Sequence, residues 1–331
     1  MVAIKDVAKK ANVSTATVSR ALSKPESVSK KTLEKVLNVI EEMQYLPNAS
    51  AQQLRMSRTK SVLVVVPDIT NTFFSKVVRG IESVASEFGY QIVLGDVHKR
   101  SEMNVKFFEQ LHQKKSDGMI LLTSNVDADA IRQLSQRYPI VLACEYVVGL
   151  NIPTVSINNI KSSCEAVDYL VQLGHRRIGT ITGPQDSVLG KDRLEGFLRS
   201  LAKHQLEVDP MHIQEGDFLY EQGYECMKRI LLCETLPTAL FVANDEMAFG
   251  AINAIREANL KVPEDISIIS FDNIKFASIF SPSLTTISQP AFEIGRTAMK
   301  YMIQLMNKEE IEEKHYILPH KLIIRESVQQ K

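Results

Sequence analysis

The 331-residue sequence predicts an α/β protein, in which an all-α N-terminal head precedes a two-lobed body of two doubly wound parallel sheets. Two observations support this fold class. From Ser61 onward, buried-type strands alternate with amphipathic helices in two successive series, a pattern typical of parallel sheets covered on both faces. Residues 1–46, in contrast, have helical apolar spacing and no strand pattern.

The head is predicted to hold three small helices. The first presents an apolar face made of Ile4, Val7, Ala8 and Ala11. Asn12 and Val13 interrupt that pattern, and Ser14 is a suitable N-cap for a second helix through Leu22. A third helix is expected from about Lys31 to Met43. Three helices with a tight turn between the first two form a helix-turn-helix unit. We therefore expect residues 1–46 to be this unit and the polar residues 47–60 to be a hinge or linker.

The charge distribution points to a polyanion at the head. Lys and Arg together number 39, as do Asp and Glu, so the chain has no net charge. Residues 1–60, however, hold eleven basic residues against five acidic ones. A basic head on a mildly acidic body indicates that one end of the molecule contacts nucleic acid.

In a helix-turn-helix unit, the start of the second helix enters the major groove and its first side chains read base edges. The expected base-reading residues are Thr15, Ala16, Thr17, Ser19 and Arg20. Lys5 and Lys31 are expected to bind phosphates, which sets affinity and salt dependence rather than sequence choice. A solvated, basic three-helix cap with no role in nucleic-acid binding is the alternative that these residues leave open.

The body, residues 61–331, is predicted to contain two series of strands. The first series is VLVVVPD, YQIVLGD, GMILLTS and IVLACEY, and the second is IGTITG, HIQEGDF, ALFVAND and DISIISFD. Amphipathic helices lie between them, such as the one expected from Phe73 to Phe88. We expect lobe 1 to comprise about 61–158 plus 291–318, and lobe 2 about 159–288 plus 319–331.

Several classes of protein are disfavoured. The longest apolar runs, Val62–Val66 and Ile140–Cys144, are far shorter than the roughly 20 residues of a membrane span. The first residues, MVAIKDVAKK, interleave charges where a signal peptide has an apolar stretch, so we expect a cytoplasmic protein without a membrane partner. The four cysteines have no metal or disulfide spacing, so we expect buried thiols and no metal.

Polar residues follow most of the predicted strands, where ligands of doubly wound sheets bind. These strand-end residues are Asp68, Asp96, Ser124, Asn158, Gly183–Arg193, Phe218, Asn244, Asp245 and Asp272. Carboxylates, amides and an arginine beside aromatic rings suit a small polyhydroxylated ligand such as a sugar or a nucleoside. The alternative is that the strand-end Asp and Asn residues cap the following helices, and we assign this role to Asp245.

The order of residues in the head favours the DNA-binding interpretation. The stretches IKDVAKKANVSTATVSRAL, VSKKTLEKVLNVIEEMQYLPN and SAQQL resemble the lactose-repressor (LacI/GalR) family, and the two-lobed body does so too. The resemblance implies a transcriptional repressor with a periplasmic-binding-protein-like body that binds a palindromic operator as a homodimer. It also implies a hinge at Asn48–Met56, with DNA contacts from Asn48, Ala51 and Leu54; the leucine is expected to wedge into the minor groove.

The same resemblance assigns candidate effector contacts in the body. Those residues are Phe73, Phe74, Asn158, Ser187, Arg193, Phe218, Asn244 and Asp272. Ser187 and Leu189 depart from the arginine and threonine that contact the base in purine-responsive relatives. The stretches VPDI, GIE, IGTITGP and NIPTVSINN are closer to the cytidine-responsive branch. A nucleoside effector is therefore expected, with a free sugar as the alternative.

Two rival functions are weaker. A sugar-binding receptor of the periplasmic kind would match the body but lacks an export signal and a use for the basic head. An enzyme is disfavoured because GxSxG, HExxH and GxGxxG are absent, and GPQDSVLGK places six residues between its glycines where a phosphate loop has four. We expect no catalytic residue and no cofactor. His175, in GHRRIG, is expected to cap a helix end.

Overall fold

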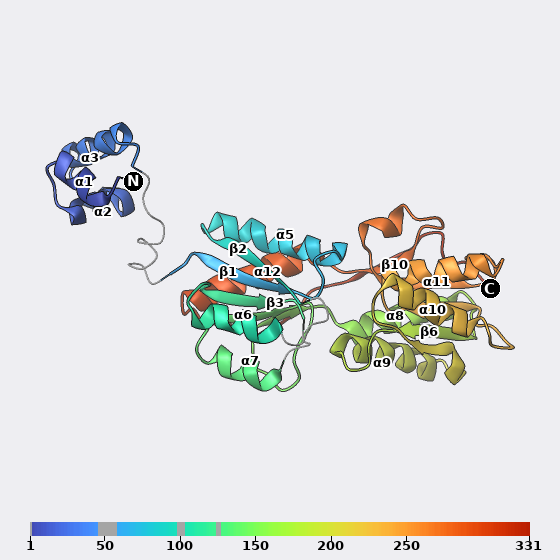
Figure 1. The fold of residues 1–331 in the computed structure, drawn as a ribbon. Coiled ribbons are helices and arrows are strands. Elements are labelled where there is room, and N and C mark those ends of the chain that lie inside the picture. Colours follow the sequence, from blue (N-terminus) through green and yellow to red (C-terminus); the bar gives the residue numbers. More distant parts are fainter. Residues whose placement is uncertain (1, 46–57, 98–102, 124–126) are drawn as a thin grey trace. The chain divides into compact units, whose positions relative to one another are not determined.

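The computed structural model describes residues 2–45, 58–97, 103–123 and 127–331, and within these the side chains of residues 103–106 are not described. It divides into two compact units, Met1–Thr59 and Lys60–Lys331 (Figure 1). The predicted hinge contacts Asn48, Ala51 and Leu54, and the strand-end residue Ser124, lie outside the described residues. No helix among the described residues is long and apolar enough to cross a membrane.

Over the described residues 2–45, the head has three α-helices and a short 3-10 helix around one small core. These are α1 (Ile4–Lys10), α2 (Thr15–Ser23), η1 (Pro25–Ser27) and α3 (Lys30–Glu42). The Ser14 hydroxyl accepts a hydrogen bond from the Thr17 N–H at the start of α2, as an N-cap does. Asn12 has φ of 48°, which lets the chain turn sharply between α1 and α2. The apolar faces meet in a core of Val7, Ala8, Ala11, Val18, Ala21, Val36, Val39 and Tyr45.

The body contains two six-stranded sheets, each with helices on both faces. The first sheet has the order β11-β5-β4-β3-β1-β2, from β1 (Ser61–Val66), β2 (Gln91–Asp96), β3 (Gly118–Leu121), β4 (Ile140–Ala143), β5 (Thr154–Ser156) and β11 (His315–Ile317). The second has the order β12-β10-β9-β8-β6-β7, from β6 (Ile178–Thr182), β7 (Ile213–Glu215), β8 (Ala239–Val242), β9 (Ser267–Asp272), β10 (Thr285–Ser288) and β12 (Lys321–Ile323). The pairings are parallel except β10 with β12. This architecture confirms the predicted α/β class.

Each sheet and its helices form one lobe. The first lobe has α5 (Thr72–Glu87), α6 (Met103–His112), α7 (Ala128–Ser135) and α12 (Ala291–Met306). The second has α8 (Asn159–Gln172), α9 (Val188–Lys203), α10 (Tyr220–Ile230), α11 (Asp245–Glu257), and the 3-10 helices η2 (Pro210–His212) and η3 (Lys275–Ser278). The chain crosses between lobes after β5, after β10 and after β11 (Figure 1).

The buried faces explain why β1 reads as an unbroken apolar run. Val62, Val64 and Val66 point into one core with α5 and α12, whereas Leu63 and Val65 point into a second core with α6 and α7. Both sets of side chains are fully buried, as expected for a central parallel strand. The two faces of β1 therefore need apolar side chains at every position.

Helices α5 and α12 pack closely because glycines lie at their contact. A Cβ on Gly295 would lie only 2.0 Å from the Val77 carbonyl oxygen, and one on Gly80 only 2.1 Å from the Phe292 carbonyl oxygen. No side chain fits at either position without moving the backbone of the facing helix. This contact holds the returning segment of the chain, α12, against the first sheet.

Candidate nucleic-acid interface and candidate effector site

The exposed first turns of α2 form the candidate nucleic-acid interface. Thr15, Ala16 and Arg20 are exposed, because the buried residues of α2, Val18 and Ala21, turn the opposite face into the core. Arginine can bind guanine through two hydrogen bonds in the major groove. These three side chains can therefore reach a base edge.

Two of the predicted base-reading residues, Thr17 and Ser19, are less accessible for contact with a base. The Thr17 hydroxyl lies 2.9 Å from the Ser14 hydroxyl, so it belongs to the helix cap, and Thr17 is half-buried. Ser19 is half-buried as well. Lys5 in α1 and Lys31 in α3 are exposed, as phosphate-binding side chains need to be. The DNA roles of all these residues stay predictions.

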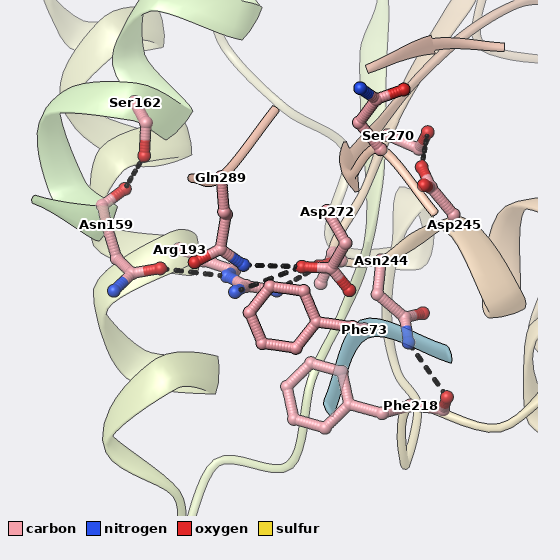
Figure 2. A network of polar contacts seen from close by, with 12 residues as sticks. Phe73, Asn159, Ser162, Arg193, Phe218, Asn244, Asp245, Ser270, Asp272 and Gln289 are labelled. Carbon is pink, nitrogen blue, oxygen red and sulfur yellow. Dashed lines mark hydrogen bonds and ion pairs between the residues drawn. The ribbon is translucent and has the colours of Figure 1, made fainter. Parts of the chain in front are cut away.

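The candidate effector site is a buried polar network around Arg193 in α9 (Figure 2). Arg193 is only 3% exposed. Its Nε donates to Asn159 Oδ1 at 3.1 Å, and its Nη1 donates to the Ala243 carbonyl oxygen at 2.5 Å. The guanidinium carbon lies 3.7 Å from the centre of the Phe271 ring. These contacts fix the plane of the guanidinium and leave Nη2 directed at Asp272.

Asp272, the last residue of β9, faces that guanidinium. Its Oδ1 accepts a hydrogen bond from Gln289 Nε2 at 2.7 Å and lies 3.6 Å from Arg193 Nη2. Asp272 and Asn273 both have positive φ, 108° and 55°, so the backbone turns abruptly where the strand ends. Burial raises the pKa of the Asp272 carboxyl to about 6, against the lowering effect of the Arg193 charge. The site thus holds a desolvated ion pair.

Asp245 does not cap a helix, so this prediction was wrong. It is the first residue of α11 and fully buried, and the N-cap is Asn244. The Asp245 Oδ1 accepts hydrogen bonds from the hydroxyls of Ser270 at 2.5 Å and Thr286 at 2.7 Å. Its Oδ2 accepts one from the Ile274 N–H at 2.8 Å. Asp245 therefore ties α11 to β9, β10 and the turn that follows Asp272.

Two aromatic residues from different lobes are drawn with this network in Figure 2. Phe218, which follows β7 and has φ of 68°, places its ring centre 5.8 Å from the Arg193 guanidinium carbon. Phe73, in the first turn of α5, comes from the first lobe and is buried. Its ring meets that of Phe74 edge to face, with 5.2 Å between their centres. The Phe218 ring therefore supplies a flat apolar surface beside a charged group.

Three of the predicted effector contacts are helix N-caps. Asn158 accepts from the Lys161 N–H, Ser187 from the Gly190 N–H, and Asn244 from the Met247 N–H. For Asn158 and Asn244 these bonds match the capping alternative considered from the sequence. The Asn244 Nδ2 donates to the Phe218 carbonyl oxygen at 2.9 Å, so Asn244 also positions that aromatic residue. Effector contact by these three residues stays a prediction.

Sequence reasoning missed two members of the network, Asn159 and Gln289. Asn159 adjoins a residue that was selected, Asn158, and the helical turn of α8 was the available clue that it faces inward. Gln289 follows β10, a strand that the sequence analysis did not identify. Both bind a charged group of the Arg193–Asp272 pair, so they hold that pair in place.

Two further sequence expectations need correction. The His175 side chain does not cap a helix: it is buried, with Nδ1 2.9 Å from the Thr238 hydroxyl and Nε2 3.1 Å from the Gln329 carbonyl oxygen. It therefore links the segment before β6 to the C-terminal residues. Of the four thiols, Cys144 and Cys226 are buried as expected, whereas Cys164 and Cys233 are only partly buried.

The fold and the two sites define a class of protein: a DNA-binding regulator whose helix-turn-helix head precedes a two-lobed ligand-binding body. Residues 3–48 match the family model described as bacterial regulatory proteins, lacI family, and residues 167–328 match a periplasmic binding protein-like domain. The chain belongs to the lacI family and is a transcriptional repressor with a DNA-binding head and an effector-binding body.

Individual relatives match over most of their length. The chain is 41% identical to the HTH-type transcriptional repressor CytR of Escherichia coli (strain K12) over 325 residues. These aligned residues are 98% of this chain and 95% of that repressor. It superposes on the lac repressor dimer bound to operator and the anti-inducer ONPF with a TM-score of 0.89, 30% identity and 99% of each chain covered. A LacI family transcriptional regulator from Enterococcus faecium with bound ribose gives a TM-score of 0.73 at 30% identity, covering 82% of this chain and 99% of that one.

Proposed function

We propose that this repressor binds a palindromic operator as a homodimer and that its effector is a nucleoside held by Arg193 and Asp272. The observation that carries the effector proposal is the set of hydrogen-bonding groups that this pair leaves open. In the described part of the chain, Asp272 Oδ2 accepts no hydrogen bond, and Arg193 Nη2 donates none, since 3.6 Å from Asp272 Oδ1 is too long.

An open donor beside an open acceptor suits a hydroxyl group. A hydroxyl can accept from the guanidinium and donate to the carboxylate at once, and two adjacent hydroxyls can share the pair. Hydrogen bonds to charged groups are worth about 1.5–3 kcal/mol each. The 2′,3′-diol of a ribosyl group has this arrangement, and the ribose bound by the Enterococcus faecium relative has it as well.

The aromatic rings favour a nucleoside over a free sugar. Phe218 lies close to the ion pair, and Phe73, from the other lobe, is drawn with the same network in Figure 2. A nucleobase is flat and stacks on such rings, which adds contact that a free pentose lacks. The resemblance to the cytidine-responsive branch agrees with this choice. A free sugar remains the second candidate because the diol chemistry alone would serve it equally.

We propose that this network binds its ligand without catalysis, because its charged groups are held by one another and by amides.

The head reads the operator with Thr15, Ala16 and Arg20 and binds phosphates with Lys5 and Lys31. Two heads on a dimer would contact half-sites about one helical turn apart. Dimerisation through the body is expected, since a three-helix head buries little area. Action on chromosomal DNA would place the protein in the cytoplasm.

Calorimetric titration tests the effector proposal. Cytidine, uridine and adenosine are compared with 2′-deoxycytidine, ribose and glucose on the full chain. We expect a nucleoside to bind best and 2′-deoxycytidine to bind about tenfold or more weakly than cytidine. Asp272→Asn should weaken binding about 10- to 100-fold, whereas Asp265→Asn, at an exposed carboxylate, should not. Ribose or glucose binding better than any nucleoside would favour the sugar alternative, and full affinity in Asp272→Asn would refute the site.

Selection from random duplexes tests the DNA proposal. The full chain should enrich a palindrome whose half-site centres are about 10 base pairs apart, and sedimentation should give two chains per operator. Enrichment of a single asymmetric half-site by one chain would contradict the dimeric reading mode.

A further inference from the structure

A hydrogen-bonded pair of side chains joins the two lobes beside the candidate effector site. Tyr146 lies in the first lobe, on the segment after β4, and Asp192 lies in the second lobe, in α9. The Tyr146 hydroxyl donates to both carboxylate oxygens of Asp192, at 3.0 Å and 3.2 Å. Both residues are half-buried. The interlobe contact is thus partly shielded from water, which strengthens a charge-assisted hydrogen bond.

The position of this pair couples it to the effector site. Asp192 immediately precedes Arg193 in α9, so a shift of one displaces the other. A second interlobe contact has the same relation to the other half of the ion pair. Lys76 Nζ, in α5 of the first lobe, donates to the carbonyl oxygen of Asn273, the residue after Asp272, at 3.2 Å. Each member of the Arg193–Asp272 pair therefore adjoins a residue that the opposite lobe holds.

The two interlobe contacts differ in strength. Lys76 is exposed and meets a neutral carbonyl group, so water competes with it. Tyr146 and Asp192 are more shielded from water, and the acceptor is a carboxylate rather than a neutral carbonyl group. The pKa of Tyr146 is raised to about 12, first by burial and then by Asp192, so its hydroxyl remains a donor across the physiological range. The groups facing Asp192 are Tyr146 across the interface and Arg193 and Glu195 on its own helix.

We propose that Tyr146 and Asp192 form an interlobe latch, which stabilises the closed arrangement of the two lobes and so positions Arg193 for the effector. Opening the lobes breaks a hydrogen bond to a charged group and exposes both partners to water. A bond of this kind shifts a two-state equilibrium by about tenfold. Since apparent affinity scales with the fraction of protein in the binding-competent state, the latch raises effector affinity. This last consequence rests on the proposed function, whereas the latch itself does not.

The test compares two tyrosine hydroxyls that both bind carboxylates. Tyr146→Phe removes the interlobe hydroxyl and keeps the ring. Tyr224→Phe is the matched control, because the Tyr224 hydroxyl donates to Glu257 at 2.5 Å within the second lobe. Spin labels at exposed Gln133 in α7 and Ala202 in α9, in the full chain with Cys164 and Cys233 replaced by serine, report the distance between lobes.

We expect Tyr146→Phe to add a population with longer interlobe distances, Asp192→Leu to do the same, and Tyr224→Phe to match the parent. An unchanged distance distribution in Tyr146→Phe overturns the latch, whatever ligand the protein binds. With cytidine, Tyr146→Phe should weaken affinity several-fold to about tenfold, and adding Asp192→Leu should cause little further loss, because both remove one interaction. If the parent chain binds no nucleoside and no sugar, the proposed effector is wrong. The latch is then tested by the distances between the spin labels alone.

Discussion

Replacing Asp245 separates the electrostatic and the hydrogen-bonding roles of a buried carboxylate. Burial, together with the charge of Asp272, raises the pKa of Asp245 to about 7, compared with about 3.9 in an unfolded chain. The folded state therefore binds the proton more tightly than the unfolded state does. The unfolding free energy of the protein should therefore rise as pH falls from 8 to 5, by about 2–3 kcal/mol from this one group.

Asp245→Asn should remove this contribution and keep the fold. A flipped amide can accept from the Ile274 N–H through its oxygen and donate to the hydroxyls of Ser270 and Thr286 through its nitrogen. Asp245→Ala, in contrast, leaves the buried Ile274 N–H without an acceptor. An unsatisfied buried donor and a small cavity should make this variant about 2–4 kcal/mol less stable than the Asn variant.

Thermal and urea unfolding of the three proteins at pH 5, 6, 7 and 8 measures these effects. The pKa of Asp272 is raised as well, so this residue also makes the protein more stable as pH falls. The contribution of Asp245 is therefore the difference between the pH dependence of the parent's unfolding free energy and that of Asp245→Asn. A contribution of about 2–3 kcal/mol corresponds to several degrees in melting temperature for a body of this size. If Asp245→Asn keeps the pH dependence of the parent, or if Asp245→Ala is as stable as Asp245→Asn, the assigned network is wrong.

Four other outcomes are expected. Arg20→Ala should lower discrimination at one operator base pair by about 1–3 kcal/mol in competition binding, and an equal loss on all sequences would contradict direct readout. Lys31→Ala should weaken binding to all duplexes alike and reduce the salt slope by about 1. Effector affinity, measured by calorimetry, should fall as pH drops through about 6, because a protonated Asp272 loses its charge, and this dependence should vanish in Asp272→Asn. Gly295→Ala should lower the unfolding free energy by about 1–3 kcal/mol, because its Cβ would meet the Val77 carbonyl oxygen, and an unchanged melting temperature would argue against that close contact.

The head illustrates how far local patterns reach. Apolar spacing, the Ser14 cap and the break at Asn12 predict the first two helices, and the structure places their ends within about one residue of the expected positions. The third helix, expected from about Lys31, starts at Lys30. These elements depend on contacts between residues three or four positions apart, which a sequence shows directly.

Short strands at or next to a sheet edge show where such patterns fail. β5, β11 and β12 have three residues each, too few for periodicity to register, and β10 is a four-residue strand of mixed polarity. These strands form because a neighbouring strand supplies hydrogen-bond partners. Gln289, which follows β10, could not be placed near Asp272 until that pairing was known.

The amino-acid sequence by itself determined the family, the helix-turn-helix head, the parallel α/β class and the candidates Arg193 and Asp272, because these follow from local periodicity and from motifs of contiguous residues. Only the tertiary structure decided which side chains meet. Asp245, next in sequence to a helix cap, is instead the acceptor for three donors from two strands and a turn. Tyr146 and Asp192, 46 positions apart, are hydrogen-bonded across two lobes. Burial and long-range pairing set the charge state and the partner of each buried polar group, and neither is encoded in a local pattern.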